Sequence, residues 1–379
     1  MDWFLNSKQG EIKKLINQLA DESKRETSAR ELMKLAPVSI PVLIDALQSS
    51  DLKLILPIQH LLALIPSASP HLIKSLQTAH PLIRGRVAEV FGISKDKNAI
   101  PVLLEALHGE FYTVRSRSAI ALGQIGDAKV IPNLIPLLKD KEDEVRIGAC
   151  VALGLFKNAS TFEKIADVLL DDPKIEVRQA AAKALGDSQH PNAIPYLLEA
   201  LRDSFWWFER EDIVKDLLNA IENMGAEAVE PLIEALSDKE KTVRKYSAML
   251  LGKLKDARAI EELGMTLYDL HDQVSLTATE SLAQIGEASI PVLTEALTHP
   301  ELSVREHAVI GLGKIQSERV IPFLVEMLKD PVRDVQKQAI QALGNFNNEL
   351  ARSALQEVVS NRSDREFHNL AKNILENQK

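Results

Sequence analysis

The sequence predicts an all-α protein, a right-handed α-solenoid of about twelve two-helix repeats. Three phrases recur in one register: Ile-Pro before an apolar run, Val-Arg about thirteen residues later, and Leu-Gly near the end of the repeat. From residue 101 onward the repeats are 30 to 32 residues apart, with one interval of 36. Because one helical pair of this kind cannot bury both of its apolar faces, the pairs must stack.

The Ile-Pro phrase marks the first helix of each repeat. At residues 100–107, Ile100, Leu103, Leu104 and Leu107 follow the spacing i, i+3, i+4, i+7, which places them on one helix face. Proline is tolerated in the first helical turn, where its missing N–H has no intrahelical partner. The prolines of this phrase are Pro41, Pro101, Pro132, Pro195, Pro291 and Pro322.

The Val-Arg and Leu-Gly phrases belong to the second helix. Gly126, Gly225 and Gly286 stand where a helix C-terminus favours a left-handed residue. The Leu-Gly glycines lie inside the helix, where glycine costs ~1 kcal/mol relative to alanine. We therefore expect the backbone of the next repeat to pack closely against glycines such as Gly123 and Gly252.

We expect one continuous solenoid domain over residues 1–379. Residues 38–348 hold the regular repeats, and residues 1–37 and 349–379 are weaker repeats that suit the two caps. The interval of 36, from Pro195 to Pro231, places about five extra residues at 203–212, between the two helices of one repeat. Insertions in solenoids often mark the binding face.

Composition narrows the class of protein. The formal net charge of −9 disfavours a nucleic-acid binder, which is usually basic. Cys150 is the only cysteine, so no disulfide forms within the chain and a reducing compartment is expected. The first residues lack the apolar run of a secretory signal, and the most apolar window, residues 54–66, is too short for a membrane span. We expect a cytoplasmic protein without membrane insertion.

Three segments resemble the HEAT-repeat family, and more closely its phycobilisome-lyase-like branch: residues 100–127, residues 131–154 and IPVLTEAL…SVREHAVIGLGKI at 290–315. In that family an aspartate before the second helix and the arginine within it form a ladder along the stack. The resemblance implies a structural ladder of Asp140, Arg146, Asp172, Arg178, Asp238 and Arg244. The pattern is broken where Gly109 precedes Arg115, His299 precedes Arg305, and Gln336 follows Asp330.

The resemblance also implies an interaction surface. Some members are subunits of lyases that attach bilins to cysteines of phycobiliproteins, and others are chaperone-like factors for the same antennae. Our leading hypothesis is a non-enzymatic scaffold that binds a protein partner through its concave face and the aromatic insertion. The alternative is a bilin lyase subunit or chaperone-like factor acting on phycobiliproteins, with bilin as a substrate and no resident cofactor.

The segment SFWWFER, residues 204–210, is the main candidate binding site. Trp and Arg dominate interface hot spots, and large aromatic side chains at a solvent-facing turn suit a partner that covers them. The candidate residues are Phe205, Trp206, Trp207, Glu209, Arg210 and Asp212, with Phe111 and Tyr112 as a second aromatic site.

Local packing between repeats is the alternative for these aromatic residues. We expect Trp206 and Trp207 to face outward and Phe208 to face inward. Under the bilin hypothesis the tryptophans would stack on pyrrole rings and Arg210 would pair with a propionate, while Glu209 or Asp212 would hold pyrrole N–H groups.

No catalytic or metal-binding pattern is found in the sequence. None of the nine histidines is followed by Glu, and no His-x-x-x-His spacing occurs. His299 and His307 fit no ligand spacing, and we expect them to be solvated. Cys150 falls in a column of small apolar residues, which predicts a packed thiol with a raised pKa.

Overall fold

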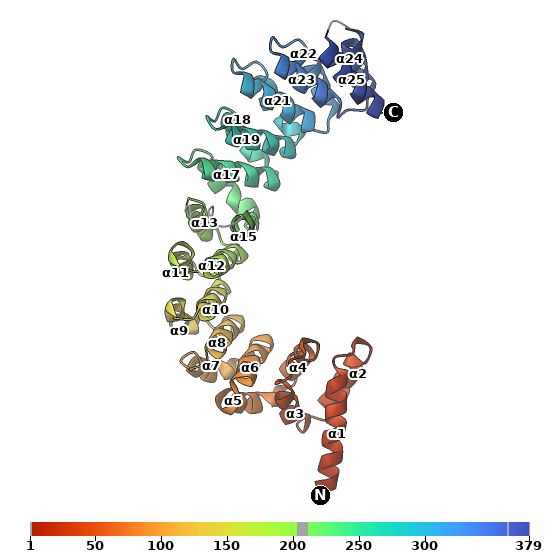
Figure 1. Ribbon diagram of the computed structural model, residues 1–379. Coiled ribbons are helices and arrows are strands. Elements are labelled where there is room, and N and C mark those ends of the chain that lie inside the picture. Colours follow the sequence, from red (N-terminus) through yellow and green to blue (C-terminus); the bar gives the residue numbers. More distant parts are fainter. Residues whose placement is uncertain (1, 203–210, 362–363, 379) are drawn as a thin grey trace. The chain divides into compact units, whose positions relative to one another are not determined.

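The computed structural model describes residues 2–202, 211–361 and 364–378, and every regular element in these ranges is an α- or 3₁₀-helix (Figure 1). The prediction of an all-α solenoid is confirmed. The chain divides into two units, Met1–Ala193 and Ile194–Lys379, which we describe separately. One continuous domain over residues 1–379, with caps at 1–37 and 349–379, stays a prediction.

Unit 1 consists of stacked helical pairs joined by short 3₁₀ turns. Its α-helices are α1 (Asp2–Gln18), α2 (Glu22–Lys34), α3 (Ser39–Ala46), α4 (Leu52–Leu64), α5 (Ser69–Thr78), α6 (Pro81–Ser94), α7 (Ile100–Ala106), α8 (Tyr112–Ile125), α9 (Ile131–Leu134), α10 (Asp143–Gly154), α11 (Ala159–Asp171) and α12 (Ile175–Ser188). Its 3₁₀-helices are η1 (Pro66–Ala68), η2 (Lys97–Ala99), η3 (Ala128–Val130), η4 (Ile135–Lys139) and η5 (Pro191–Ala193).

Unit 2 repeats the same pairing. Its α-helices are α13 (Ile194–Ala200), α15 (Glu211–Glu222), α16 (Val229–Ala235), α17 (Lys241–Leu254), α18 (Ile260–Thr266), α19 (Asp272–Ile285), α20 (Ile290–Ala296), α21 (Leu302–Lys314), α22 (Ile321–Met327), α23 (Arg333–Leu343), α24 (Glu349–Ser360) and α25 (Arg365–Asn377). Its 3₁₀-helices are η6 (Gly225–Ala228), η7 (Ala257–Ala259), η8 (Glu287–Ser289) and η9 (Glu318–Val320).

The helices of unit 1 form two layers. The first helices α5, α7, α9 and α11 form the outer layer, and the second helices α6, α8, α10 and α12 lie on the inner side of its curve (Figure 1). The core between the layers is aliphatic: Leu103 of α7 and Val114 and Leu122 of α8 are almost fully buried. Such burial across two layers is the main source of stability in a stacked fold.

Glycines in the second helices let neighbouring repeats approach closely. A Cβ atom added at Gly123 of α8 would lie 2.7 Å from the Cα of Ala152 in α10. In unit 2, a Cβ atom at Gly252 of α17 would lie 2.7 Å from the Cα of Ser281 in α19. Both distances are far below van der Waals contact, so the expectation of close backbone packing at these glycines is correct.

The helix ends follow the predicted punctuation. Gly126, Gly225 and Gly286 all have positive φ, as expected for residues that end a helix. Within the described residues no single helix is long and apolar enough to cross a membrane. Only α4 and the following segment Pro66–Thr78 reach that length together, and they are bent by 97°.

Candidate interaction surface

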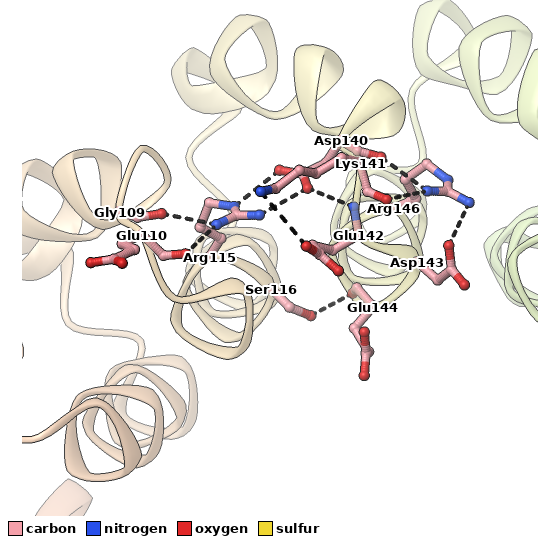
Figure 2. A network of polar contacts seen from close by, with 10 residues as sticks. All are labelled: Gly109, Glu110, Arg115, Ser116, Asp140, Lys141, Glu142, Asp143, Glu144 and Arg146. Carbon is pink, nitrogen blue, oxygen red and sulfur yellow. Dashed lines mark hydrogen bonds and ion pairs between the residues drawn. The ribbon is translucent and has the colours of Figure 1, made fainter.

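An arginine near the start of α8 joins two repeats (Figure 2). Arg115 donates from Nε and Nη2 to the two carboxylate oxygens of Asp140, at 3.0 and 2.9 Å. Its Nη1 donates to the carbonyl oxygens of Gly109 and Glu110, both at 2.9 Å. The guanidinium therefore holds the interhelix turn of its own repeat and the carboxylate of the next repeat.

The same arrangement recurs along both units. The arginine of one repeat bonds the aspartate 25 or 26 residues later: Arg146 with Asp172 at 2.7 Å, Arg244 with Asp269 at 2.5 Å, and Arg305 with Asp330 at 2.8 Å. We refer to these pairs, with Arg115 and Asp140, as the ladder. Its side chains are at least 87% buried, because the exposed fractions run from 3% to 13%. Bidentate ion pairs of this kind combine strength with a fixed geometry.

The aspartate six residues before an arginine contributes its carbonyl oxygen to that arginine. Arg146 Nη1 donates to the carbonyl of Asp140 at 2.9 Å, and Arg178 Nε donates to the carbonyl of Asp172 at 2.6 Å. Arg244 Nη1 likewise donates to the carbonyl of Asp238 at 2.8 Å. Each of these three arginines therefore contacts the backbone of the aspartate six residues before it.

An arginine uses a backbone carbonyl within its own repeat and a carboxylate from the next repeat, and this difference explains the exceptions in the sequence pattern. Any residue supplies a carbonyl, so Gly109 serves Arg115, and His299 serves Arg305 at 2.9 Å. Gln336 keeps the contact without a charge, because its Nε2 donates to the carbonyl of Asp330 at 2.7 Å. The ladder residues that the sequence reading did not nominate are Arg115, Asp269, Arg305 and Asp330. The signal for them was the spacing of 25 or 26 residues from arginine to aspartate.

Asp238 has a different partner. Its carboxylate accepts two hydrogen bonds from Arg202, at 2.9 and 2.6 Å, and Arg202 stands two residues after the end of α13. The Arg202 side chain is 37% exposed, whereas that of Asp238 is 7% exposed. An arginine from the end of a first helix thus supplies the positive charge at this repeat.

Two aspartates of the ladder, Asp140 and Asp269, are charged at neutral pH. Burial alone would raise the pKa of Asp140 and Asp269, but hydrogen bonds from Arg115, Arg244 and the turn N–H groups outweigh it and lower both pKa values. The hydrogen bond from Arg244 to Asp269 also raises the pKa of Arg244. These charges neutralise one another and hold adjacent repeats in register, which is a structural role.

The main predicted binding segment lies outside the described residues. Residues 203–210 and the side chains of residues 211–213 are not described, so no contact is assigned to Phe205, Trp206, Trp207, Glu209, Arg210 or Asp212. The orientations expected for the two tryptophans and for Phe208 stay predictions for the same reason.

The second aromatic site is described. Phe111 precedes α8 and Tyr112 is the first residue of the helix; their exposed fractions are 42% and 39%. Both side chains lie at the turn that Arg115 holds through Glu110. They are accessible to a partner, and their role in binding stays a prediction.

Cys150 is a buried thiol. Its side chain lies in α10 with no exposed surface, and burial raises its pKa to about 12, so the nucleophilic thiolate form is scarce at neutral pH. Among the residues that the structure describes, no three His, Cys, Asp or Glu side chains are grouped in a way that would hold a metal ion.

His307 contradicts its predicted solvation, because its side chain is buried. Its Nδ1 lies 2.8 Å from Ser275 Oγ, and its Nε2 lies 3.4 Å from Asp272 Oδ1, an order that resembles a hydrolase triad. However, the Ser275 hydroxyl donates its only proton to the carbonyl of Leu267 at 2.7 Å. Ser275 is itself buried, so it presents no nucleophile to a substrate, and the group joins α19 to α21.

Large exposed apolar side chains of unit 1 gather on its second helices. None is found on the first helices α3, α5, α7, α9 and α11, all of which are fully described. Those on or next to second helices are Met33 of α2, Leu52, Leu56 and Leu64 of α4, Leu82 and Ile93 of α6, Phe111 and Tyr112 at α8, and Val151 and Leu155 at α10, whereas Val38 stands directly before the first helix α3. Most of the large exposed apolar side chains of unit 1 therefore lie on its second helices, among exposed polar and charged ones.

Five apolar side chains on or next to three packed second helices recur at repeat-related positions; Ile120 and Ile147 among them are half-buried, and Gln124 stands at the position between Ile93 and Leu155. Ile147, Val151 and Leu155 follow the spacing i, i+4, i+8 on α10, so they share one helix face. Ile120 of α8 stands one repeat before Val151, and Ile93 of α6 stands two repeats before Leu155. We call Ile93, Ile120, Ile147, Val151 and Leu155 the inner apolar face.

The family model for HEAT repeats matches residues 69–146, 131–218, 261–344 and 290–373, which together make up well over half of the chain. The chain belongs to the HEAT-repeat family. The Arg–Asp ladder and the glycine contacts described above are therefore features of its HEAT repeats. A comparison of the sequence with curated proteins gives no match.

Solved structures of Kap121p agree with the fold. Kap121p is 16% identical over 98% of this chain and 49% of its own, with a TM-score of 0.53, and Kap121p bound to Nup53p gives 0.55 at 16% identity. The chain thus spans about half the length of Kap121p. The complex of CpcE and CpcF of phycocyanin lyase from Nostoc sp. PCC7120 is 21% identical over 59% of this chain and 91% of that chain, with a TM-score of 0.35. The Kap121p structures support the fold and nothing finer.

Proposed function

We propose that the chain is a non-enzymatic scaffold that binds a protein partner. Its binding surfaces are the inner apolar face of unit 1 and the aromatic insertion at residues 203–212. The observation that carries the proposal is the gathering of exposed apolar side chains on the inner helices of unit 1, while the outer helices have none. Contiguous exposed apolar surface marks interaction sites more often than chance, and interface cores are depleted of charge.

The ladder suits this function because it fixes the spacing of the binding helices. Each Arg–Asp pair joins one second helix to the turn of the next repeat, so the apolar side chains of α8 and α10 are held in register. A surface that is ordered before binding loses less conformational entropy when a partner docks. Kap121p, which has the same general fold, has been solved bound to Pho4p and to Nup53p. This is an analogy of fold.

Affinity capture with a matched pair of variants tests the proposal. The chain carrying Val151→Asp and Leu155→Asp loses the partner that the wild-type chain captures from its own cells. Both side chains are exposed, so the melting temperature changes little. Lys164→Glu on the outer helix α11 changes the net charge by the same amount and retains the partner. Equal capture by both variants would refute this binding face.

A phycobiliprotein is one candidate partner, on the sequence resemblance alone. The lyase alternative predicts covalent bilin transfer when the chain is produced with a bilin and an apo-phycobiliprotein. A stable complex without transfer favours the scaffold, whereas transfer that requires the chain contradicts a non-enzymatic role. We place the scaffold in the cytoplasm, without a resident cofactor, nucleic-acid partner or membrane insertion, on the composition of the chain.

A further inference from the structure

A groove of about 470 Å³ lies between α2 and α4, the second helices nearest the N-terminus. Leu19 and Leu61 are among its lining residues and are almost fully buried, so they form its floor. Met33 lines the groove from α2 and Leu56 lines it from α4. The groove is separate from the inner apolar face, which lies on α6, α8 and α10.

Neither α2 nor α4 contains a glycine. Further along the stack, a Cβ atom at Gly92 of α6 would lie 3.2 Å from the Cα of Ala121 in α8, and Gly123 allows a similar close approach of α8 and α10. No glycine contact of this kind is found between α2 and α4, and the groove lies between these two helices.

The walls of the groove are apolar and exposed to solvent. Leu52, Leu56 and Leu64 of α4 are 67%, 55% and 66% exposed, and Met33 of α2 is 41% exposed. The three leucines lie in the i+4 series of residues 52, 56, 60 and 64 along α4, so they form a ridge about 20 Å long that is interrupted by His60, which also lines the groove. A small molecule on the groove floor would leave this ridge in water, whereas a helix about 10 Å wide covers both walls.

The charge at the rim selects the kind of helix. Arg25, Arg30 and Lys53 line the groove together with one carboxylate, Glu26, so its lining is positive on a chain with a net charge of −9. Arg30 forms an ion pair with Glu26, and Arg25 Nε donates to the carbonyl of Leu19 at 2.9 Å. The excess positive charge therefore belongs to Arg25 and Lys53, on opposite walls. A helix lying between them meets a cation on either side.

Building on the proposed scaffold function, we infer that the groove binds an acidic amphipathic helix of a partner protein. Leucine-type side chains at i, i+4 and i+7 fill the space between Met33 and the ridge of Leu52, Leu56 and Leu64. Asp and Glu residues on the flanks of the helix face Arg25 and Lys53. Helix-in-groove recognition uses this division, in which apolar anchors supply affinity and flanking charges set orientation and on-rate.

A pair of designed peptides tests the inference on the full-length chain. The first is a fluorescein-labelled helix of about 15 residues with leucines on one face and glutamates on its flanks, long enough to follow α4. The second has lysine in place of each glutamate. Fluorescence anisotropy is expected to show at least about tenfold tighter binding of the acidic peptide, which corresponds to about 1.4 kcal/mol.

Two variants locate the binding. The variant with Leu56→Asp and Leu64→Asp binds the acidic peptide at least about tenfold more weakly than the wild-type chain. The variant with Val151→Asp and Leu155→Asp, on the inner apolar face, binds it with unchanged affinity. Circular dichroism melting checks that both variants fold. Equal affinity for the two peptides, absence of binding, or indifference to Leu56→Asp with Leu64→Asp overturns the inference.

A vesicle assay separates the competing occupant. The wild-type chain and the variant with Leu56→Asp and Leu64→Asp are each sedimented with phosphatidylglycerol vesicles. If only the wild-type chain sediments with the vesicles, and it does not bind the acidic peptide, the groove is a membrane-binding surface and the inference is wrong. If partner capture depends on Val151 and Leu155 but the acidic peptide does not bind, the inference about the groove is wrong. The proposed scaffold function is then unaffected.

Discussion

At Gly123 the absence of a side chain sets the distance between two repeats. An added Cβ atom would lie 2.7 Å from the Cα of Ala152 and 2.8 Å from its carbonyl oxygen. Both are backbone atoms of α10, and they cannot move without shifting the whole helix. The glycine therefore costs helix propensity within α8 and gains close packing with the next repeat.

We expect Gly123→Ala to lower the free energy of unfolding by about 1–3 kcal/mol, the usual cost of overpacking, even though alanine is the better helix former. Gly10→Ala in α1 is the matched control, because nothing lies within 4 Å of its added Cβ atom. That substitution should stabilise by about 0.5–1 kcal/mol. Urea denaturation followed by circular dichroism measures both, and a Gly123→Ala chain as stable as the wild type would contradict the close contact.

Single residues also show how far sequence reasoning reaches. The recurrence of Leu-Gly was enough to predict the close contact at Gly123, because a costly residue repeated in register needs a packing reason. The burial of His307 was not predictable in this way. It depends on Ser275 and Asp272 of the preceding repeat, and no local pattern around His307 points to them.

The ladder is the element that joins one repeat to the next. Asp172→Ala leaves Arg146 with its carbonyl and Asp143 contacts but without the buried carboxylate of the next repeat. Removing one partner of a buried pair typically costs about 3–5 kcal/mol, and the remaining contacts should bring the loss to roughly 2–4 kcal/mol.

The control for Asp172→Ala is the exposed pair of Glu287 and Arg319, whose side chains are 57% and 73% exposed. Glu287→Ala should change the free energy of unfolding by less than about 1 kcal/mol. Equal effects of the two substitutions in urea denaturation would show that the ladder adds no more than a surface pair.

Acid should weaken the ladder in a defined direction. The pKa values of Asp140, Asp238 and Asp269 in the folded chain lie below their ordinary value, which is about 3.9 in an unfolded chain. Their contribution to stability is therefore complete above about pH 5 and is lost as the pH falls through about 4 toward the folded pKa. The urea midpoint should be flat near neutral pH and fall below pH 4.

The variant with Asp140→Asn and Asp269→Asn tests whether the ladder causes this acid sensitivity. Its urea midpoint should already be lower at pH 7 and should decrease less between pH 5 and pH 3. A decrease as steep as that of the wild-type chain would assign the acid sensitivity to other carboxylates.

At the scale of elements the sequence predicted the existence of the helices better than their details. The first helix at 131–139 is α-helical only to Leu134 and then 3₁₀, because Pro136 has no N–H for a regular α-helical bond. Which carboxylate meets which arginine depends on the offset between stacked repeats. The sequence holds both a spacing of 6 and a spacing of 25 or 26 residues between aspartate and arginine, and periodicity does not tell which of the two joins the side chains.

For unit 1 as a whole, the nearest-neighbour character of the stack makes a strong prediction. Deleting residues 127–157, one repeat, places Arg115 as many positions before Asp172 as Arg146 is now. The shortened chain should keep its helical content per residue and melt cooperatively, only a few degrees lower. Deletion of residues 127–142 alone removes a first helix and leaves its second helix without a partner. This deletion should lower the melting temperature and the helical content far more. Equal loss of helicity in both would contradict independent repeats.

The whole-molecule reading succeeded where the sequence repeats and failed where it departs from the repeat. Three phrases in one register are sufficient for the solenoid, because Ile-Pro marks a helix start and Val-Arg and Leu-Gly each mark a contact between repeats. The groove between α2 and α4 was missed because it depends on the distance between two stacked helices in a weak terminal repeat. The sequence pattern of a single repeat does not contain that distance.

Site-specific photo-crosslinking tests the central claim, binding of a protein partner on the inner apolar face, most directly. A photoreactive residue placed at Val151, on the inner helix α10, should form one discrete crosslink to a partner protein in the native cells. The same residue at Lys164, on the outer helix α11, should form none. No crosslink from position 151, or the same products from both positions, would contradict the claim.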